Sequence, residues 1–189
     1  MSATIARDDP LRPIHARSVI QISHRGDGTI DFSQVLEYDY EDVSGKDVYH
    51  HRVTSDPRFV KEEISVLERN MQGFLDEETN VVNGLRVFPR VLTTFIAFRG
   101  EPRYPTCTWL IAWSANVGDS DTFTYDARVE PATLEYGVES IYTLPPNARV
   151  VSIESSLPYD NAIKNIIIFR GAKGDKVGEI ERLAWIIEQ

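Results

Sequence analysis

The sequence contains a single cysteine, Cys107, in 189 residues, and this excludes an intrachain disulfide. Cys107 lies between two threonines in an apolar segment, where a small buried hydrophobic side chain is the expected role. No neighbouring histidine or cluster of positive charge is present to activate a catalytic thiolate. The low cysteine content fits a reducing compartment.

Positive charge is also scarce. The chain has 20 lysines and arginines against 29 aspartates and glutamates, a formal net charge of −9. Binding to a nucleic-acid backbone requires clustered Lys and Arg side chains, and the sequence has no such run. An anionic membrane surface requires the same clusters. We therefore expect neither nucleic acid nor membrane as a partner.

Long hydrophobic runs are absent as well. No segment approaches the roughly 18 apolar residues that a membrane-spanning helix requires. The first residues lack the basic segment followed by an apolar one that marks a secretion signal. These features predict no transmembrane segment, no signal peptide and a cytoplasmic location.

The sequence lacks the familiar catalytic motifs. It has no nucleophile elbow, phosphate-binding loop or dinucleotide fingerprint. His50 and His51 are adjacent, so in a strand they would point to opposite faces and would not share a metal ion. The sequence therefore favours a non-enzymatic protein. An enzyme whose acid and base meet only in the fold is a third alternative, because such a pair leaves no local signature.

What the chain does contain is a pattern typical of β-structure. With 42% hydrophobic residues it can bury a full core. Residues 1–13 are polar and contain two X-Pro pairs, which predicts a flexible lead-in before a single domain over 14–189. Short apolar segments separated by turn residues are typical of a sandwich or jelly roll. The predicted strands are 14–24, 29–40, 47–54, 91–98, 106–115, 122–129, 133–142, 149–155, 163–170 and 181–187. Between 47–54 and 91–98, the 80–87 region is predicted to form a hairpin with an Asn83-Gly84 turn.

One amphipathic helix is predicted over 57–75. Asp56 suits the N-cap and Pro57 the first helical position. A single apolar stripe runs along it, formed by Val60, Ile64, Leu67, Met71 and Phe74. Charged residues at Glu62, Glu63, Glu68 and Arg69 are expected to face water. The predicted fold is an antiparallel β-sandwich, jelly-roll-like or immunoglobulin-like, with this helix packed on a sheet face.

Three predicted strands, 91–98, 106–115 and 163–170, are apolar on both faces, which is typical of central strands covered on both sides. A strand face left uncovered by the helix would need a partner subunit, so we expect a homo-oligomer. In contrast, residues 35–41 alternate between acidic and apolar side chains, which indicates a strand near a sheet edge.

A short phrase recurs three times: an apolar run, a ring residue, an arginine and a glycine. The arginines are Arg25, Arg99 and Arg170. If the three strand ends met at one end of the sandwich, these side chains would converge on an anionic ligand. The alternative is local pairing with the carboxylates that follow them, Asp27, Glu101 and Asp175.

Asp119-Ser120-Asp121 resembles the start of a calcium-binding loop, but the glycine that a full loop needs at its sixth position is missing. Asp119 and Asp121 are thus candidate Ca²⁺ ligands, with an ordinary polar turn as the alternative.

Aromatic residues offer a further candidate site. Trp109 and Trp113 share a strand face and either stack on a sugar or belong to the core. Several dispersed tyrosines are candidates to line a groove at a sheet edge: Tyr38, Tyr40, Tyr125, Tyr136 and Tyr142. The sequence thus favours a non-enzymatic protein that acts through self-association or protein binding in an assembly. A module that binds a carbohydrate or another small ligand, with or without Ca²⁺, is the alternative.

Overall fold

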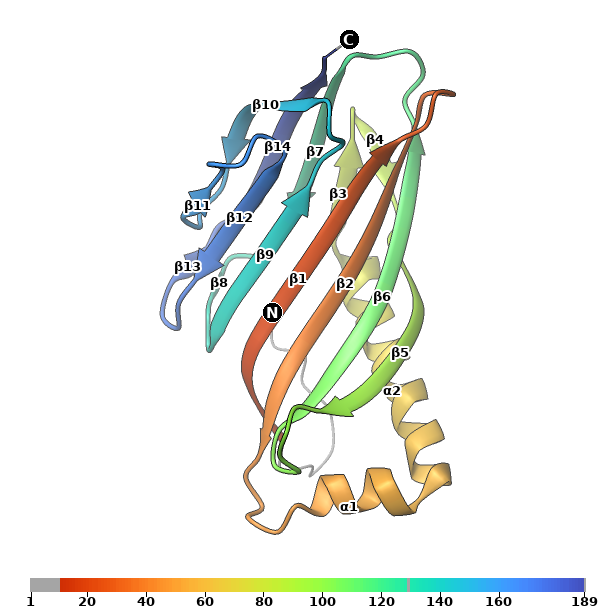
Figure 1. Cartoon of the computed structure of the whole chain (residues 1–189), viewed down its shortest axis with the longest axis vertical. Coiled ribbons are helices and arrows are strands. Elements are labelled where there is room, and N and C mark those ends of the chain that lie inside the picture. Colours follow the sequence, from red (N-terminus) through yellow and green to blue (C-terminus); the bar gives the residue numbers. More distant parts are fainter. Residues whose placement is uncertain (1–10, 129, 189) are drawn as a thin grey trace.

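The computed structural model describes residues 11–128 and 130–188. It shows a β-sandwich of two packed sheets with two helices, as the sequence predicts (Figure 1). No helix in the described residues is long and apolar enough to cross a membrane.

The larger sheet, sheet A, has seven strands. All its neighbouring strands pair antiparallel except β1 and β9, which pair parallel. Its order across the sheet is β11 (Tyr159–Asp160), β12 (Ile166–Gly171), β9 (Gly137–Thr143), β1 (Leu11–His24), β2 (Thr29–Asp42), β6 (Pro105–Asn116) and β5 (Arg90–Phe98).

The smaller sheet, sheet B, has five strands, and a two-stranded sheet accompanies it. The order in sheet B is β10 (Ala148–Glu154), β14 (Ile180–Ile187), β7 (Thr122–Arg128), β3 (Thr79–Val82) and β4 (Leu85–Val87). The small sheet pairs β13 (Lys176–Val177) with β8 (Ala132–Thr133). Asn83 and Gly84 both have positive φ, 46° and 80°, which confirms the predicted hairpin turn between β3 and β4.

The core lies between the inner faces of the two sheets. Trp109 and Trp113 on β6 are both buried there, with Phe32 stacked on Trp113 at a ring distance of 5.0 Å. The two tryptophans therefore belong to the core and are not a sugar-binding strip. On sheet B, Trp185 and Phe123 pack in the same way.

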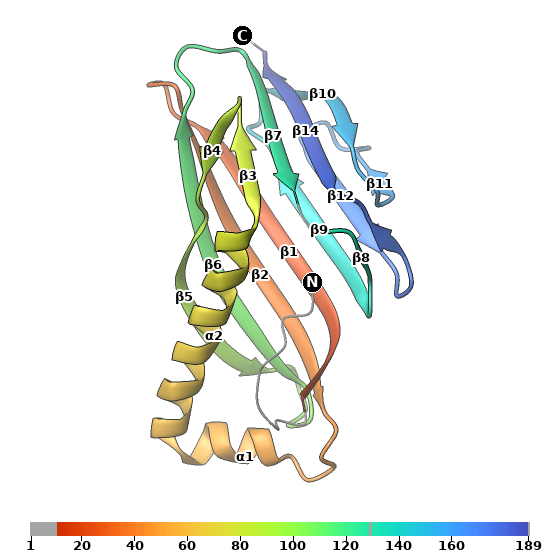
Figure 2. The ribbon, with the colours of Figure 1, turned by 180° about the vertical axis from the view of Figure 1, so that it is seen from behind.

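Helix α2 (Pro57–Glu77) extends the layer formed by sheet B (Figure 2). Asp56 caps it, since its side chain accepts hydrogen bonds from the backbone N–H groups of Arg58 and Phe59 at 3.0 and 3.2 Å. Trp109 Nε1 donates to the Leu67 carbonyl at 3.2 Å, so the helix covers the same inner face of sheet A that faces sheet B. Glu63, expected to face water, is instead buried and accepts from the Tyr49 hydroxyl.

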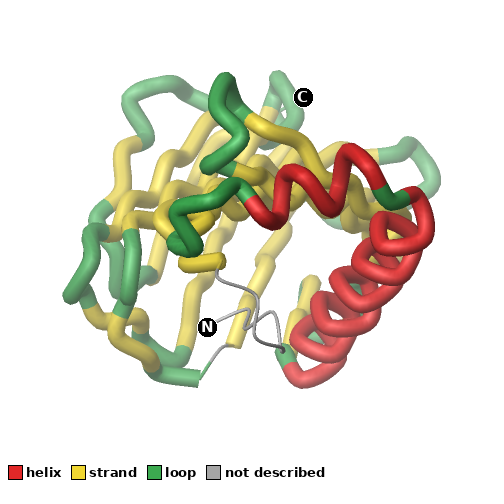
Figure 3. Tube along the Cα trace, turned by 90° about the horizontal axis from the view of Figure 1, so that it is seen from below, coloured by secondary structure: helices red, strands yellow, loops and turns green. Residues whose placement is uncertain are grey.

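A second helix, α1 (Val48–Ser55), occupies the residues for which a strand over 47–54 is predicted, so that prediction is wrong. Asp42 Oδ2 accepts from the Tyr49 N–H at 3.1 Å and satisfies one of the free donors at the helix start. Near its end, the Thr54 hydroxyl donates to the His50 carbonyl at 2.8 Å. The Asp42 contact and the burial of Tyr49 against Phe59 of α2 favour the helix over the strand that the β-branched residues would prefer. Figure 3 shows α1 and α2 meeting at a corner.

Strand boundaries elsewhere follow the prediction with small changes. β1 begins at Leu11, so residues 11–13 of the predicted lead-in are part of a strand. Residues 1–10, the remainder of that lead-in, lie outside the described residues. The predicted strand 133–142 is divided between β8 and β9.

Two predictions of strand position are wrong. β5 is an edge strand of sheet A, and its side chains Leu92 and Phe95 are 65% and 44% exposed. β2, predicted near an edge, lies between β1 and β6 inside the sheet. Its acidic face alternates as predicted, but that face is the outer face of an interior strand. Arg12 on β1 and two arginines of the β5–β6 turn, Arg99 and Arg103, pair with its carboxylates there.

Candidate ligand-binding site between the two sheets

A cavity of about 450 Å³ lies between β9 and β12 of sheet A and β7 and β14 of sheet B, beside the small sheet of β8 and β13. Binding sites for small organic molecules have volumes of this order, about 300–1,000 Å³. Its walls are mostly apolar. We call it the large chamber; its apolar lining residues are Ala127, Ala132, Leu134, Val138, Leu157, Phe169, Val177 and Leu183.

A second cavity of about 220 Å³ adjoins the first. It lies between β1, β2 and β6 of sheet A and the last turn of α2, where Met71, Phe74 and Leu75 form one wall. We call it the small chamber. The two chambers have five lining residues in common, which makes them neighbouring compartments of one site: Tyr38, Tyr125, Ala127, Ser140 and Tyr142.

Tyrosines form the boundary between the chambers. The rings of Tyr38 and Tyr136 meet edge to face at 6.0 Å, and those of Tyr125 and Tyr142 lie 6.3 Å apart. Burial raises the pKa of Tyr38 and of Tyr142, so both hydroxyls stay protonated. Both side chains keep some accessible surface although they lie deep in the molecule, because they face the chambers.

Polar groups converge on the small chamber. Gln34 Nε2 donates to Ser18 Oγ at 2.9 Å, and the Tyr125 hydroxyl donates to Asn80 Oδ1 at 2.6 Å. Asn80 and Trp113 also line this chamber, and Asn80 Nδ2 and Trp113 Nε1 are buried with no hydrogen-bond acceptor among the described residues. A buried donor without a partner costs about 1–3 kcal/mol, so these two N–H groups favour an occupant that offers acceptors.

Glu78 brings a carboxyl group to the small chamber. It follows α2 directly, and its backbone N–H bonds to the Phe74 carbonyl at 3.2 Å. Burial raises the pKa of Glu78 above its ordinary value. The Asn80 amide opposes part of this increase, although Nδ2 is not placed to hydrogen-bond to it. Glu78 is the one acidic or basic residue that lines the small chamber in the described chain.

The large chamber carries further negative charge. Glu130, Glu135 and Glu181 line it, together with one cation, Arg182. Arg182 is held by a bidentate pair with Asp126, at 2.6 and 3.0 Å. The lining of the two chambers is therefore net acidic, and its guanidinium is already engaged.

Gly171 shapes the wall of the large chamber. A Cβ atom placed there would lie 2.4 Å from Leu134 Cδ1 and 3.0 Å from Val138 Cγ2. The third contact would be with Leu157 Cδ2 at 3.0 Å, so a side chain at this position would displace three lining side chains; the φ of Gly171 is not positive. Of the three glycines in the repeated phrase, Gly100 alone has a positive φ, +85°.

The three arginines of the repeated phrase are not brought together around one ligand. Arg25 pairs with Asp31 at 2.5 Å, and Arg99 pairs with Glu37 at 2.9 Å. Because Asp31 and Glu37 are six positions apart on β2, they are about 20 Å apart along the strand. Arg170 pairs with Glu139 at 3.1 Å on β9. All three arginines pair with outer-face carboxylates of sheet A and not with Asp27, Glu101 or Asp175.

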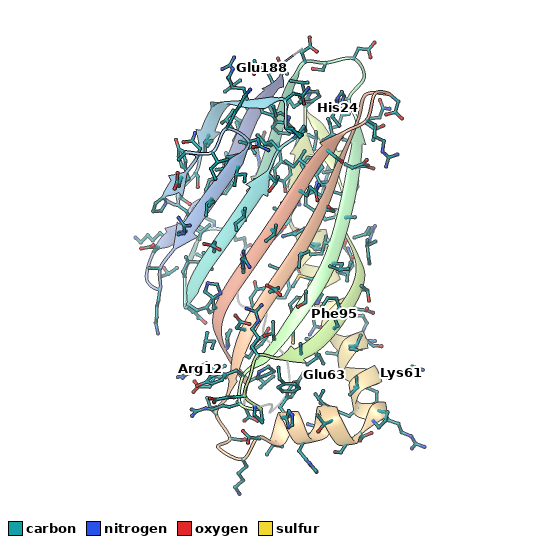
Figure 4. The ribbon with its side chains drawn as sticks, viewed as in Figure 1. Arg12, His24, Lys61, Glu63, Phe95 and Glu188 are labelled. Carbon is teal, nitrogen blue, oxygen red and sulfur yellow. The ribbon has the colours of Figure 1, made fainter. Side chains whose placement is uncertain are left out.

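Asp119 and Asp121 lie in the loop between β6 and β7, and both are exposed. They border a hollow of about 300 Å³ together with His24, which ends β1 at the opposite end from Arg12 (Figure 4). In the described chain, no three His, Cys, Asp or Glu side chains are grouped so that they could hold a metal ion.

Part of the site is visible in the sequence. Four of the five tyrosines selected there line the chambers, although between the sheets rather than at a sheet edge. Sequence reasoning missed Asn80 and Glu78. A signal for Glu78 exists, because it continues the spacing of Leu67, Met71 and Phe74 and so takes the next position on the buried stripe of the helix.

Comparison with known proteins gives little further information. No known family and no curated protein matches this sequence. An aminopeptidase N family protein from Idiomarina loihiensis has a TM-score of 0.35 and 10% identity, over 89% of this chain and 29% of that chain. Acetylcholine-binding protein type 1 from Biomphalaria glabrata has a TM-score of 0.32 and 7% identity, over 100% of this chain and 91% of that chain. Likenesses at this level support no conclusion about function.

Proposed function

We propose that this protein binds a small organic molecule between its two sheets. The observation that carries the proposal is the pair of adjoining chambers, about 450 and 220 Å³, inside the sandwich. Protein interiors are normally close-packed, with few voids larger than a water molecule. A space of this size, lined by tyrosines and apolar side chains, is therefore the part of the molecule best suited to hold a ligand.

Buried polar groups support this reading. An apolar ligand alone would leave Asn80 Nδ2 and Trp113 Nε1 without partners. The expected ligand therefore has an apolar body for the large chamber and at least one hydrogen-bond acceptor for the small one. This is the alternative function inferred from the sequence, with the site placed inside the sandwich.

Ligand screening by thermal shift tests the proposal, because a molecule that binds only the folded state raises the melting temperature. Fragments that stabilise the wild-type protein are then measured on Ala127→Phe, which places a ring where the chambers meet. Thr122→Phe on the same strand is the matched control, since Thr122 is exposed and lines neither chamber.

We expect stabilising fragments to lose their effect on Ala127→Phe and to keep it on Thr122→Phe. A chemically diverse fragment library that stabilises neither the wild type nor the control would overturn the proposal. So would fragments that stabilise all three proteins equally, because they would bind elsewhere.

Self-association through the outer face of sheet A is the second candidate function. Five aliphatic side chains form one row across this face, in register from strand to strand: Ile168, Ile141, Val19, Val35 and Leu110. Val35 is 39% exposed, and none of the described elements packs on this face. We call these residues the aliphatic row.

A second copy of the chain is the partner that suits this face. The net charge of −9 disfavours contact between copies. Beside the aliphatic row, however, Arg17 and Arg170 both pair with Glu139, at 3.3 and 3.1 Å, so this part of the surface carries no excess of negative charge. Two such faces therefore meet without the repulsion that the net charge imposes.

Sedimentation at two protein concentrations tests self-association. We expect an assembly that Val35→Lys dissociates and that Thr122→Lys, an exposed position on sheet B, leaves intact. A monomer at high concentration would contradict this candidate. A non-enzymatic role and a cytoplasmic location are part of the same proposal and rest on sequence composition.

A further inference from the structure

The charge of the two chambers selects among ligands. Glu78 lines the small chamber and three other glutamates line the large one, whereas the single cation, Arg182, is paired with Asp126. Glu78 and Glu181 are partly buried, whereas Glu130 and Glu135 are exposed and contribute less, because water screens exposed charges more strongly. The lining therefore repels an anionic ligand and attracts a cationic one.

The last turn of α2 adds to this preference. Phe74, Leu75 and Glu78 line the small chamber, so the carboxyl end of a 21-residue helix lies at its wall. The final carbonyl groups of a helix carry partial negative charge, which stabilises a nearby cation. The carboxyl end of the helix and the Glu78 carboxylate therefore both favour a positive charge in the small chamber.

Tyrosine rings complete the surroundings. Tyr38, Tyr125 and Tyr142 line both chambers, and the charge of Glu78 is near enough to add to the burial that raises the pKa of each. Aromatic faces attract an ammonium group within about 6 Å of the ring centre. A carboxylate among tyrosine rings is a suitable environment for an ammonium group.

We propose that the ligand of the small chamber is a small organic amine, bound as its ammonium ion by Glu78 among Tyr38, Tyr125 and Tyr142. This proposal rests on the proposed function, because it names the class of ligand for the same site. The apolar part of the amine occupies the large chamber.

Two buried N–H donors without acceptors restrict the class of ligand further. Asn80 Nδ2 and Trp113 Nε1 line the chamber that contains Glu78, and neither has an acceptor among the described residues. An ammonium group offers donors only, so these two N–H groups require a second polar group on the ligand. The amine therefore carries an oxygen acceptor, such as a hydroxyl or a carbonyl, close to its nitrogen.

Binding of such an amine is coupled to a proton. Because burial raises the pKa of Glu78, its carboxyl group stays neutral up to a higher pH in the free protein than an exposed glutamate does. The ammonium ion favours the carboxylate, so binding lowers this pKa and releases a proton to solvent. Among the described residues, the other titratable groups that face Glu78 are Tyr38, Tyr125 and Tyr142, whose raised pKa values keep them neutral over the same range.

Calorimetric titration with three matched probes tests the proposal. The probes are 2-amino-1-phenylethanol, which is cationic, 1-phenylethanol, which is neutral, and mandelate, which is anionic. We expect the amine to bind at least about tenfold more tightly than the alcohol, as a charge-assisted hydrogen bond in a partly buried site predicts, and mandelate to bind most weakly.

The matched variants are Glu78→Gln and Glu101→Gln. Glu101 is exposed in the turn between β5 and β6, so its substitution changes the net charge equally without touching the chambers. We expect Glu78→Gln to weaken amine binding by about tenfold and leave 1-phenylethanol unchanged, and Glu101→Gln to change neither. Trp113→Phe should weaken the amine and the alcohol together, because it removes a donor to their hydroxyl group.

A measurement on the wild type keeps the test independent of how well Glu78→Gln folds. Amine titrations in two buffers of different ionisation enthalpy, repeated at several pH values from 4.5 upward, report the protons released. Net release supports the proposal, whereas zero release contradicts it.

Equal affinity for the three probes, or amine binding that survives in folded Glu78→Gln, would overturn the amine assignment. The proposed function would stand in that case if fragments still lose their stabilising effect on Ala127→Phe. Failure of all three probes to bind overturns the amine assignment, and failure of the fragment library as well overturns both.

Discussion

Substitution of Gly28 by alanine tests how the β1–β2 turn is fixed against the loop that follows β6. Gly28 has φ +82°, and a Cβ atom there would lie 2.7 Å from the backbone carbonyl carbon of Gly118. The Val117 N–H also donates to the Gly28 carbonyl at 2.9 Å, so the two backbones are held together. Neither backbone segment yields as easily as a flexible side chain.

Gly100→Ala provides a matched comparison. Gly100 has nearly the same φ, +85°, but nothing lies within 4 Å of its added Cβ atom. Its substitution therefore measures the left-handed backbone alone, about 1–2 kcal/mol. At Gly28 the added Cβ atom would also have to displace the Gly118 backbone. This displacement costs a further amount comparable to overpacking a core, about 1–3 kcal/mol. We expect Gly28→Ala to lower the free energy of unfolding by about 2–5 kcal/mol in all.

Urea unfolding followed by tryptophan fluorescence measures both variants against the wild type. We expect Gly28→Ala to be at least about 1 kcal/mol less stable than Gly100→Ala. Equal stability of the two variants would show that the contact with Gly118 relaxes without cost, and would refute the argument from steric contact.

Three further outcomes are expected. Asp42→Ala, which removes the acceptor of the Ser44 and Tyr49 N–H groups, should lower the free energy of unfolding by about 2 kcal/mol and reduce helix content in circular dichroism. Cys107 should not react with a thiol reagent in the folded protein and should react fully in urea, because burial raises its thiol pKa and shields it; rapid reaction of the native protein would contradict the buried placement. The folded-state pKa of Glu78 is raised above the ordinary 4.5, so near and above pH 4.5 the native state binds more protons than the unfolded state. The free energy of unfolding of the wild type relative to Glu78→Gln should therefore fall as the pH rises from 4.5 through the folded-state pKa. An unchanged difference between pH 4 and pH 8 would argue against a buried Glu78.

The order of strands and helices follows largely from local patterns, and the failures have physical causes. Residues 47–54 contain β-branched side chains typical of a strand. The folded chain nevertheless brings the Asp42 carboxylate, five residues before the segment, to the start of the helix, where it accepts from the Tyr49 N–H. In β5, the apolar residues on both faces suggest a central strand. Leu92 instead lies at an irregularity in the pairing with β6, where the strand departs from regular register.

The candidate site also depends on contacts between distant parts of the chain, which the sequence does not reveal. The tyrosines are conspicuous in the sequence, but nothing local indicates that β2, β7 and β9 bring them around one cavity. Tyr38 and Tyr125 belong to different sheets, and their shared chamber depends on the packing of those sheets. The outer-face arginine partners were missed for the same reason, since Arg99, which follows β5, and Glu37 on β2 are far apart in the sequence.

The parallel pairing of β1 with β9 also determines when the binding site can exist. β1 and β2 form a hairpin from neighbouring residues, whereas His15 pairs with Gly137, which is far away along the chain. Contacts between distant segments form late, because closing the long loop costs entropy before any contact compensates for it. The large chamber lies along β9 and β12, and its wall is therefore completed after the N-terminal strands have already paired. Tyr38 lies on β2 and Tyr142 on β9, so a ligand that touches both spans the late-forming pairing of β1 with β9. Its binding would therefore slow the separation of β9 from β1.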